Sequence, residues 1–320
     1  MFQAMKSTLA LSAFFVAVGV ATDLCGEVPC VENSVLLQNK HQMTGPEQLT
    51  PVKAKESQTK SDPKSILKNF PPVRDCSCDK DKAFIMTTYT AESWGGYWEL
   101  KLELEKYIIH AELLEGQDQV DFQLPQRFPD GTPGPCLYFV YFAGTSPADL
   151  NFLKTRATTE GATVLLMAAD DNTIHFIFRD FFPGASVGHE WSTPNYVCRD
   201  PLGLEPSSQQ GTIAQALTAG IDALPTYEFV APNKNYNPLG PLVLPGDVQV
   251  IWTDTTEGWG NITFLREHGK GMVIWDGTLW VYTDSCGVVP LPGDIQTYVK
   301  NLVTVTLLRA CLVPQGLGQN

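Results

Sequence analysis

The sequence predicts an α+β protein that is rich in β-structure, and three observations support this. Tyr, Phe, Trp, Val and Thr, which favour strands, are frequent beyond residue 75. Turn residues recur between short apolar runs. Two of these turns separate apolar segments that are typical of hairpin arms. We therefore expect antiparallel sheets with hairpins and a few helices, held together by disulfide bonds.

The first 21 residues are typical of a secretory signal peptide. Lys6 gives a positive start, Leu9 to Val20 is apolar, and small residues end at Ala21. This apolar run is too short to span a bilayer, which needs about 20 such residues. We predict no stable membrane span, and a protein that is secreted or held in the lumen of the secretory pathway.

Residues 22–75 are predicted to form a disordered leader or linker, or a pro-segment that is removed. The stretch from Asn39 to Ser65 is polar, rich in lysine and free of aromatic residues. Such a composition cannot bury enough apolar surface to fold alone.

The cysteines favour a disulfide framework. The chain has 8 of them, all beyond the predicted cleavage point, and an oxidising compartment would allow up to four bonds. The spacing leaves their pairing open. The C-x-C pair at Cys76 and Cys78 lacks a second pair or a nearby histidine, so we predict no metal. The candidates are Cys25, Cys30, Cys76, Cys78, Cys136, Cys198, Cys286 and Cys311.

Charge excludes some classes of partner. Residues 76–320 carry 14 basic and 28 acidic side chains. An acidic body argues against nucleic acid and anionic membrane surfaces, which both recruit basic patches. No motif indicates a cofactor, and the oligomeric state stays open.

Two similar segments suggest a duplication. "TVLLMAADDNTIHFIFRD" (163–180) and "GMVIWDGTLWVYTD" (271–284) each have a turn pair between apolar arms, at Asp171-Asn172 and Asp276-Gly277. Before the first, Ser146 and Pro147 predict the start of a helix. Phe-Leu followed by a basic residue recurs at Phe152 and Phe264. We predict two related strand–helix–hairpin units, at 76–209 and 210–320.

The second hairpin supplies the ligand-binding candidates. Side chains alternate along a strand, so Met272 and Ile274 share one face. Trp275, Trp280 and Tyr282 share the other, aromatic face. This face is either a second core or an exposed stacking surface for a glycan or a small apolar ligand.

Two short motifs allow other readings. Gly96-Tyr97-Trp98 and Tyr282-Thr283-Asp284 resemble the G-x-W and T-D-Y signatures of lipocalins, although the second lacks its final tyrosine. This resemblance implies a ligand-holding β-barrel. Asn261-Ile262-Thr263 is an N-glycosylation sequon, which predicts a glycan on Asn261.

A serine hydrolase is the alternative enzyme class. Gly184-Ala185-Ser186-Val187-Gly188 matches the G-x-S-x-G nucleophile elbow. The triad would join Ser186 to His268 and to an acid, Asp254 or Asp247. The segment shows no helical period, however, and Gly184 is typical of a turn. We therefore expect a non-catalytic ligand-binding or structural protein, stabilised by disulfides, with the hydrolase as the alternative.

Overall fold

The structure is a computed structural model, and it describes residues 62–69, 77–87, 96–115, 122–141, 146–167, 179–185, 202–226, 243–254, 260–277 and 291–311. The chain divides into two compact units, Met1–Ala54 and Lys55–Asn320. Every described residue belongs to the second unit. The predicted signal peptide therefore lies outside the described residues, as does most of the predicted leader.

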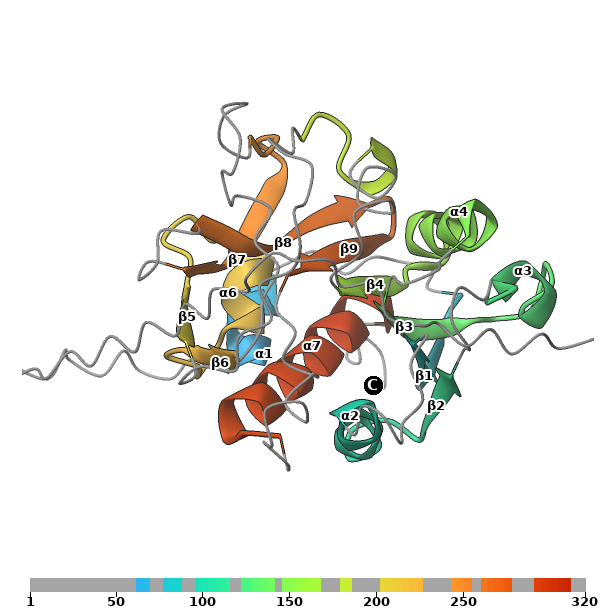
Figure 1. Cartoon of the computed structure of the whole chain (residues 1–320), viewed down its shortest axis with the longest axis horizontal. Helices are drawn as coiled ribbons and strands as arrows, with labels where there is room; N and C mark the ends of the chain where they lie inside the picture. The colour runs from blue at the N-terminus through green and yellow to red at the C-terminus, as the bar shows by residue number, and fades with distance from the viewer. Residues whose placement is uncertain are drawn as a thin grey trace, which may run out of the picture. The chain divides into compact units, whose positions relative to one another are not determined.

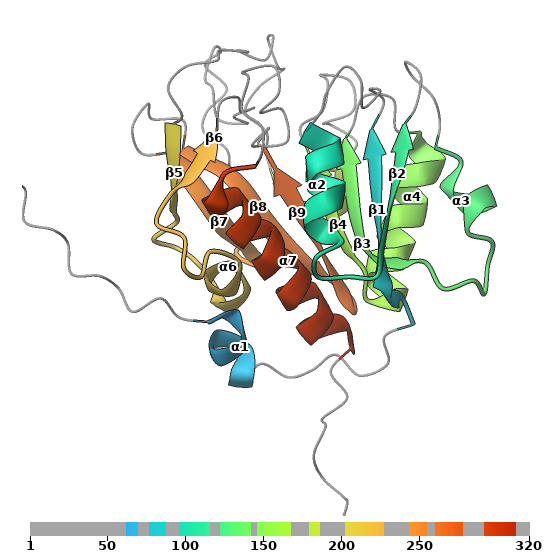
Figure 2. The same ribbon diagram turned by 90° about the horizontal axis from the view of Figure 1, so that it is seen from below.

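A nine-stranded mixed sheet forms the centre of this unit, in the order β2-β1-β3-β4-β9-β8-β7-β5-β6. The first five strands in this order are parallel to one another, and the remaining pairs are antiparallel. Figure 2 shows the arrows of the parallel strands pointing to one common edge. The strands are β1 (Asp79–Thr87), β2 (His110–Glu115), β3 (Pro135–Tyr141), β4 (Thr163–Met167), β5 (Leu202–Pro206), β6 (Leu224–Thr226), β7 (Val248–Asp254), β8 (Gly260–His268) and β9 (Gly271–Asp276).

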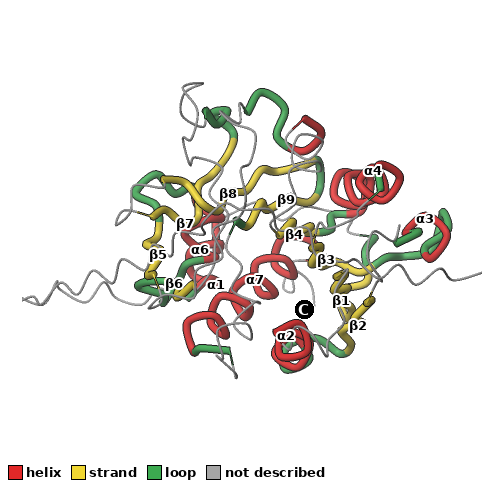
Figure 3. Tube along the Cα trace, viewed as in Figure 1, coloured by secondary structure: helices red, strands yellow, loops and turns green. Residues whose placement is uncertain are grey.

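Helices cover both faces of the sheet, as Figures 1 and 3 show. On one face lie α2 (Gly96–Leu104), α6 (Thr212–Leu217) and α7 (Gly293–Cys311). On the other lie α3 (Leu124–Arg127) and α4 (Pro147–Thr155), which continues into the π-helical turn η2 (Arg156–Glu160). Ser146 caps α4 by accepting a hydrogen bond from the backbone N–H of Asp149, with Pro147 in the first turn, as the sequence predicts.

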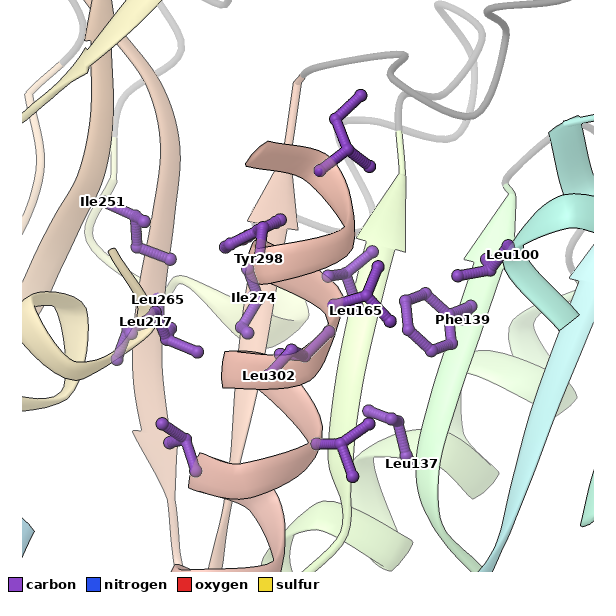
Figure 4. Close-up of a cluster of buried hydrophobic side chains, with 14 of the residues drawn as sticks. Leu100, Leu137, Phe139, Leu165, Leu217, Ile251, Leu265, Ile274, Tyr298 and Leu302 are labelled. Atoms are coloured by element: carbon purple, nitrogen blue, oxygen red, sulfur yellow. The ribbon is translucent and has the colours of Figure 1, made fainter. Parts of the chain in front are cut away.

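Each face has its own buried core, which explains why the central strands are apolar throughout rather than alternating. Under α7 lie Leu165 and Ile274, with Tyr298 and Leu302 of the helix directed toward them (Figure 4). Under α4 lie Leu166 and Trp275. The assignment of Met272 and Ile274 to one face and Trp275 to the other is thus confirmed, and both faces are core.

The prediction of antiparallel sheets with hairpins holds for part of the sheet, and the two predicted hairpins need correction. β9 pairs with β4 on one side and with β8 on the other. Neither edge of β9 is open for the hairpin arm predicted after Asp276-Gly277. β4 is likewise flanked by β3 and β9, so it has no open edge for the arm predicted after Asp171-Asn172. Turn chemistry is a local signal, whereas these strands find partners distant in sequence.

The predicted repeat is not shown either. Phe152 lies in helix α4, but its counterpart Phe264 lies in strand β8. Strands from both sides of the predicted boundary at residue 210 also alternate in one sheet, since β9 pairs with β4 and β5 pairs with β7.

One disulfide bond is described, between Cys78 and Cys136, with their Cα atoms 4.9 Å apart. It joins the residue before β1 to the second residue of β3, the neighbouring strand. Cys311 ends α7, and the other five cysteines lie outside the described residues, so their pairing stays a prediction.

Within the range predicted as a leader, one short segment is ordered against the body. Residues Pro63–Ile66 form helix α1, and Leu67–Asn69 form a 3-10 turn. Helix α1 contacts α6 and α7, and Leu67 is buried in the core under α7. Asp62 caps α1 with its carboxylate, so the local sequence favours this helix.

Candidate functional site

The aromatic ligand-binding candidates are only partly described. Trp275 is fully buried in the core under α4, where Leu166 and Phe264 are its partners on the adjoining strands. Trp275 is therefore a core residue and does not form an exposed stacking surface. Trp280 and Tyr282 lie outside the described residues.

Of the alternative triad, Asp254 and His268 lie apart, whereas the placement of Ser186 is not described. Ser186 lies just outside the described residues, after Gly184, which has a φ of 90° as expected of a turn glycine. Asp254 pairs with Gly260 at one end of the β7–β8 ribbon, and His268 lies at the other end. Eight residues of strand separate the two ends, which is roughly 26 Å. Asp254 therefore cannot orient the imidazole of His268.

The His268 imidazole has a structural contact. Its Nε2 lies 2.6 Å from the carbonyl oxygen of Phe181, and a carbonyl only accepts, so Nε2 is the donor. Burial lowers the pKa of His268, and the nearby Arg266 lowers it further. Arg266 also donates to the carbonyl of Pro183 at 3.2 Å and forms an ion pair of 2.7 Å with Asp247, the other candidate acid. These contacts hold Phe181 and Pro183, shortly before Ser186, against the C-terminal end of β8.

The lipocalin resemblance does not extend to the fold. Gly96, Tyr97 and Trp98 open helix α2. The described sheet has two ends, at β2 and β6, and so is open rather than a closed barrel. Tyr282-Thr283-Asp284 lies outside the described residues.

The sequon lies near the start of strand β8. Asn261 is half-buried, and its Oδ1 accepts a hydrogen bond of 3.3 Å from the hydroxyl of Thr253. Thr263, the third residue of the sequon, is fully buried. Glycosylation of Asn261 stays a prediction.

A buried polar cluster lies at the edge where the parallel strands end. Asp276 is the last residue of β9, and it pairs with Thr263 of β8, which in turn pairs with Trp252 of β7. The three residues form a row across the sheet under the first turns of α7, where Tyr298 lies. We call Asp276, Thr263, Trp252 and Tyr298 the Asp276 cluster.

Contacts within the Asp276 cluster are specific. The Thr263 hydroxyl donates a hydrogen bond of 3.0 Å to Oδ1 of Asp276. The rings of Trp252 and Tyr298 meet edge to face, with centroids 5.6 Å apart. Burial raises the pKa of Tyr298 well above its ordinary value, and the negative charge of Asp276 raises it further. Tyr298 therefore stays a neutral phenol beside the carboxylate.

An irregularity in β7 places Trp252 in this row. The pairing of β7 with β8 shifts between Val250 and Trp252, which leaves Ile251 as an extra residue. The carbonyl of Ile251 accepts hydrogen bonds of 3.0 Å from the backbone N–H of Ser207 and from the side chain of Gln210. Such bulges re-aim side chains and are frequent beside functional sites.

The topology of the sheet also favours this edge as a ligand site. The connection from β1 to β2 carries α2 on one face, whereas the connection from β3 to β4 carries α4 on the other. Ligands of open α/β sheets bind beyond the carboxyl ends of the strands, near such a reversal. The Asp276 cluster lies at this edge, two strands away from β3.

Sequence reasoning missed the cluster. It assigned Asp276 to a hairpin turn and Thr263 to a sequon, and only the pairing of three strands reveals that they meet. Within the described ranges, no group of three His, Cys, Asp or Glu residues is placed to hold a metal ion. No described helix is long and apolar enough to cross a membrane.

The comparisons with known proteins give a likeness to solved structures. Protein-family models give no match. Curated proteins give no match either. Among solved structures, the chain is similar to an exo-beta-1,4-mannosidase from Opitutaceae bacterium strain TAV5, with 12% identity and a TM-score of 0.36. The likeness covers 71% of this chain and 35% of that chain, so this chain spans about a third of that structure's length.

Proposed function

We propose that the protein is an exported, non-catalytic binding protein whose ligand is a glycan or a small apolar molecule. The proposed site lies at the carboxyl edge of the parallel strands, next to the Asp276 cluster, whose four side chains are fully buried. The observation that carries the proposal is the row of Asp276, Thr263 and Trp252 at this edge. Export is supported by the signal-like start of the chain and is compatible with the disulfide bond.

The cluster is fully buried in the structure as described, but its composition is typical of a ligand site. Binding sites for small molecules are mostly apolar and aromatic, with a few placed polar groups. Here one carboxylate and one aliphatic hydroxyl lie beside two aromatic rings that carry an O–H and an N–H, within an apolar core. Sugar hydroxyls donate to a carboxylate and their C–H faces pack on aromatic rings, whereas a purely apolar ligand offers a carboxylate no donor. We therefore favour a glycan.

Chain connectivity keeps two of the aromatic candidates near the Asp276 cluster. Trp280 and Tyr282 follow Asp276 by four and six residues. A chain extends at most about 3.6 Å per residue, so they lie within about 14 Å and 22 Å of Asp276. Their rings can supply the walls of the same site.

Two variants and a matched control test the proposal. Asp276→Asn and Trp280→Ala should each abolish binding on a glycan array while the far-ultraviolet circular dichroism stays that of the native protein. Asp130→Asn, a change of the same kind at an exposed position, should leave binding unchanged. If the wild-type chain binds no glycan and no apolar probe, or if Trp280→Ala unfolds the protein, the proposed site is wrong.

A further inference from the structure

The two edge strands of the sheet, β2 and β6, differ in how well they are protected from pairing with a strand of another chain. An edge strand exposes unpaired backbone N–H and C=O groups, which natural proteins shield with prolines, bulges or very short strands. β6 has three residues, and its Pro225 lacks an N–H. β2, at the other end, has six residues in unbroken register with β1, and contains neither proline nor lysine. β2 is therefore the less protected end of the described sheet, and it is the last strand at that end in Figure 2. One of its backbone groups, the N–H of Ala111, donates a hydrogen bond of 3.3 Å to Oε1 of Glu105.

Apolar side chains also gather at this end. Ile109, immediately before β2, is 78% exposed, and Trp98 on α2 is 48% exposed. Leu102 lies one turn from Trp98 on the same helix and is exposed as well. Leu113 and Leu114 of β2 are only partly buried. Four of the five most exposed large apolar residues described lie between residues 98 and 109.

The pattern of apolar and polar residues along this edge is symmetric about Ala111. Residues 108–114 read Ile-Ile-His-Ala-Glu-Leu-Leu. Antiparallel pairing of two copies about Ala111 places Ile109 opposite Leu113 and His110 opposite Glu112, and each pair occurs twice. This pairing extends β2 backward over Ile109 and replaces the hydrogen bond of 3.3 Å from the Ala111 N–H to Oε1 of Glu105. Every apolar residue then meets an apolar residue, each His110 meets a carboxylate, and the smallest side chain lies on the axis. Opposed pairs of these kinds stabilise antiparallel strands.

We propose that the protein forms a two-fold homodimer in which β2 pairs antiparallel with β2 of a second copy about Ala111. The two sheets become one continuous sheet, and both α2 helices lie on the same face beside the axis. A self-complementary patch of this kind closes into a dimer, because each copy offers the same surface. The proposal does not depend on the proposed ligand site.

Mass measurement of the full secreted chain tests the dimer. Light scattering on a sizing column should give twice the mass of one chain. Ile109→Asp should give the mass of a single chain, and because Ile109 is mostly exposed, the fold should persist by circular dichroism. Val243→Asp is the matched control, since Val243 is also exposed, at 56%, but lies far from β2 in the sequence, just before β7. It should remain dimeric.

A charge exchange tests the register. His110→Glu places two carboxylates opposite each other twice, and should give the monomer. It also removes the contact of His110 with Glu105, whose atoms lie 3.9 Å apart. The double variant His110→Glu, Glu112→His restores the pairing of a histidine with a carboxylate across the axis, and should restore the dimer. A wild-type monomer at every concentration, an Ile109→Asp dimer, or a double variant that stays monomeric would overturn the proposal.

Discussion

The hydroxyl of Thr263 donates a hydrogen bond of 3.0 Å to Oδ1 of Asp276, and both side chains are fully buried. Burial of a carboxylate is costly unless donors satisfy its oxygens, so this bond stabilises the fold as well as orienting Asp276. The two residues come from adjacent antiparallel strands and are paired in register.

Removal of this donor should destabilise the protein. Thr263→Val keeps the shape of the side chain but takes one hydrogen bond from a buried carboxylate, so the free energy of unfolding should fall by about 1–3 kcal/mol. Urea denaturation followed by circular dichroism measures the change. Thr155→Val, at an exposed position of α4, should change the free energy of unfolding much less. Equal effects of the two substitutions would contradict a buried bond.

Trp275 should behave as a core residue. Trp275→Ala removes a fully buried indole between β4 and β8, and should lower the free energy of unfolding by about 3–5 kcal/mol. The same denaturation experiment measures this. A Trp275→Ala variant of native stability would show that the ring is not packed as described.

The disulfide bond should contribute strongly to stability. It closes a loop across a sequence separation of 58 residues, which restricts the unfolded chain. The double variant Cys78→Ala, Cys136→Ala should lose about 2–4 kcal/mol of unfolding free energy in denaturant titrations. Mass spectrometry of a non-reduced digest should recover Cys78 and Cys136 in one linked pair of peptides. Recovery of either cysteine as a free thiol in the native protein would contradict this bond.

His268 should make stability depend on pH. Because burial lowers its pKa in the folded state, the unfolded chain binds the proton more readily. Stability is then fully present above the ordinary histidine pKa of about 6.5, and falls as the pH drops below it. His268→Gln keeps a donor for the carbonyl of Phe181 without the titration, so its stability should fall less between about pH 7 and pH 5. An unchanged slope would exclude His268 as the source.

Local signals in the sequence predicted local features well. Ser146 and Pro147 mark the start of α4, because a hydroxyl cap and a fixed φ favour a helix there whatever surrounds it. The placement of Ile274 and Trp275 on opposite faces of β9 likewise follows from the period of a strand.

Long-range pairing was not predictable in the same way. β4 and β9 are parallel neighbours although about a hundred residues separate them, and no periodicity in either strand specifies that partner. Asp276-Gly277 has the chemistry of a hairpin turn, but β9 forms its hairpin with β8 instead, through Gly269 and Lys270. Gly269 has a φ of 57° and lies against the backbone of Thr158, where a side chain would clash. The hairpin turn of β9 therefore lies before the strand, at a position where no turn was predicted from the sequence.

The most direct test of the central claim is calorimetric titration of a glycan selected on an array, with wild-type protein and the Asp276→Asn variant. We expect the wild-type protein to bind and Asp276→Asn to lose binding, while Asp130→Asn retains the wild-type affinity. A folded Asp276→Asn variant that binds the glycan as tightly as the wild type would contradict the assignment of this edge as the binding site.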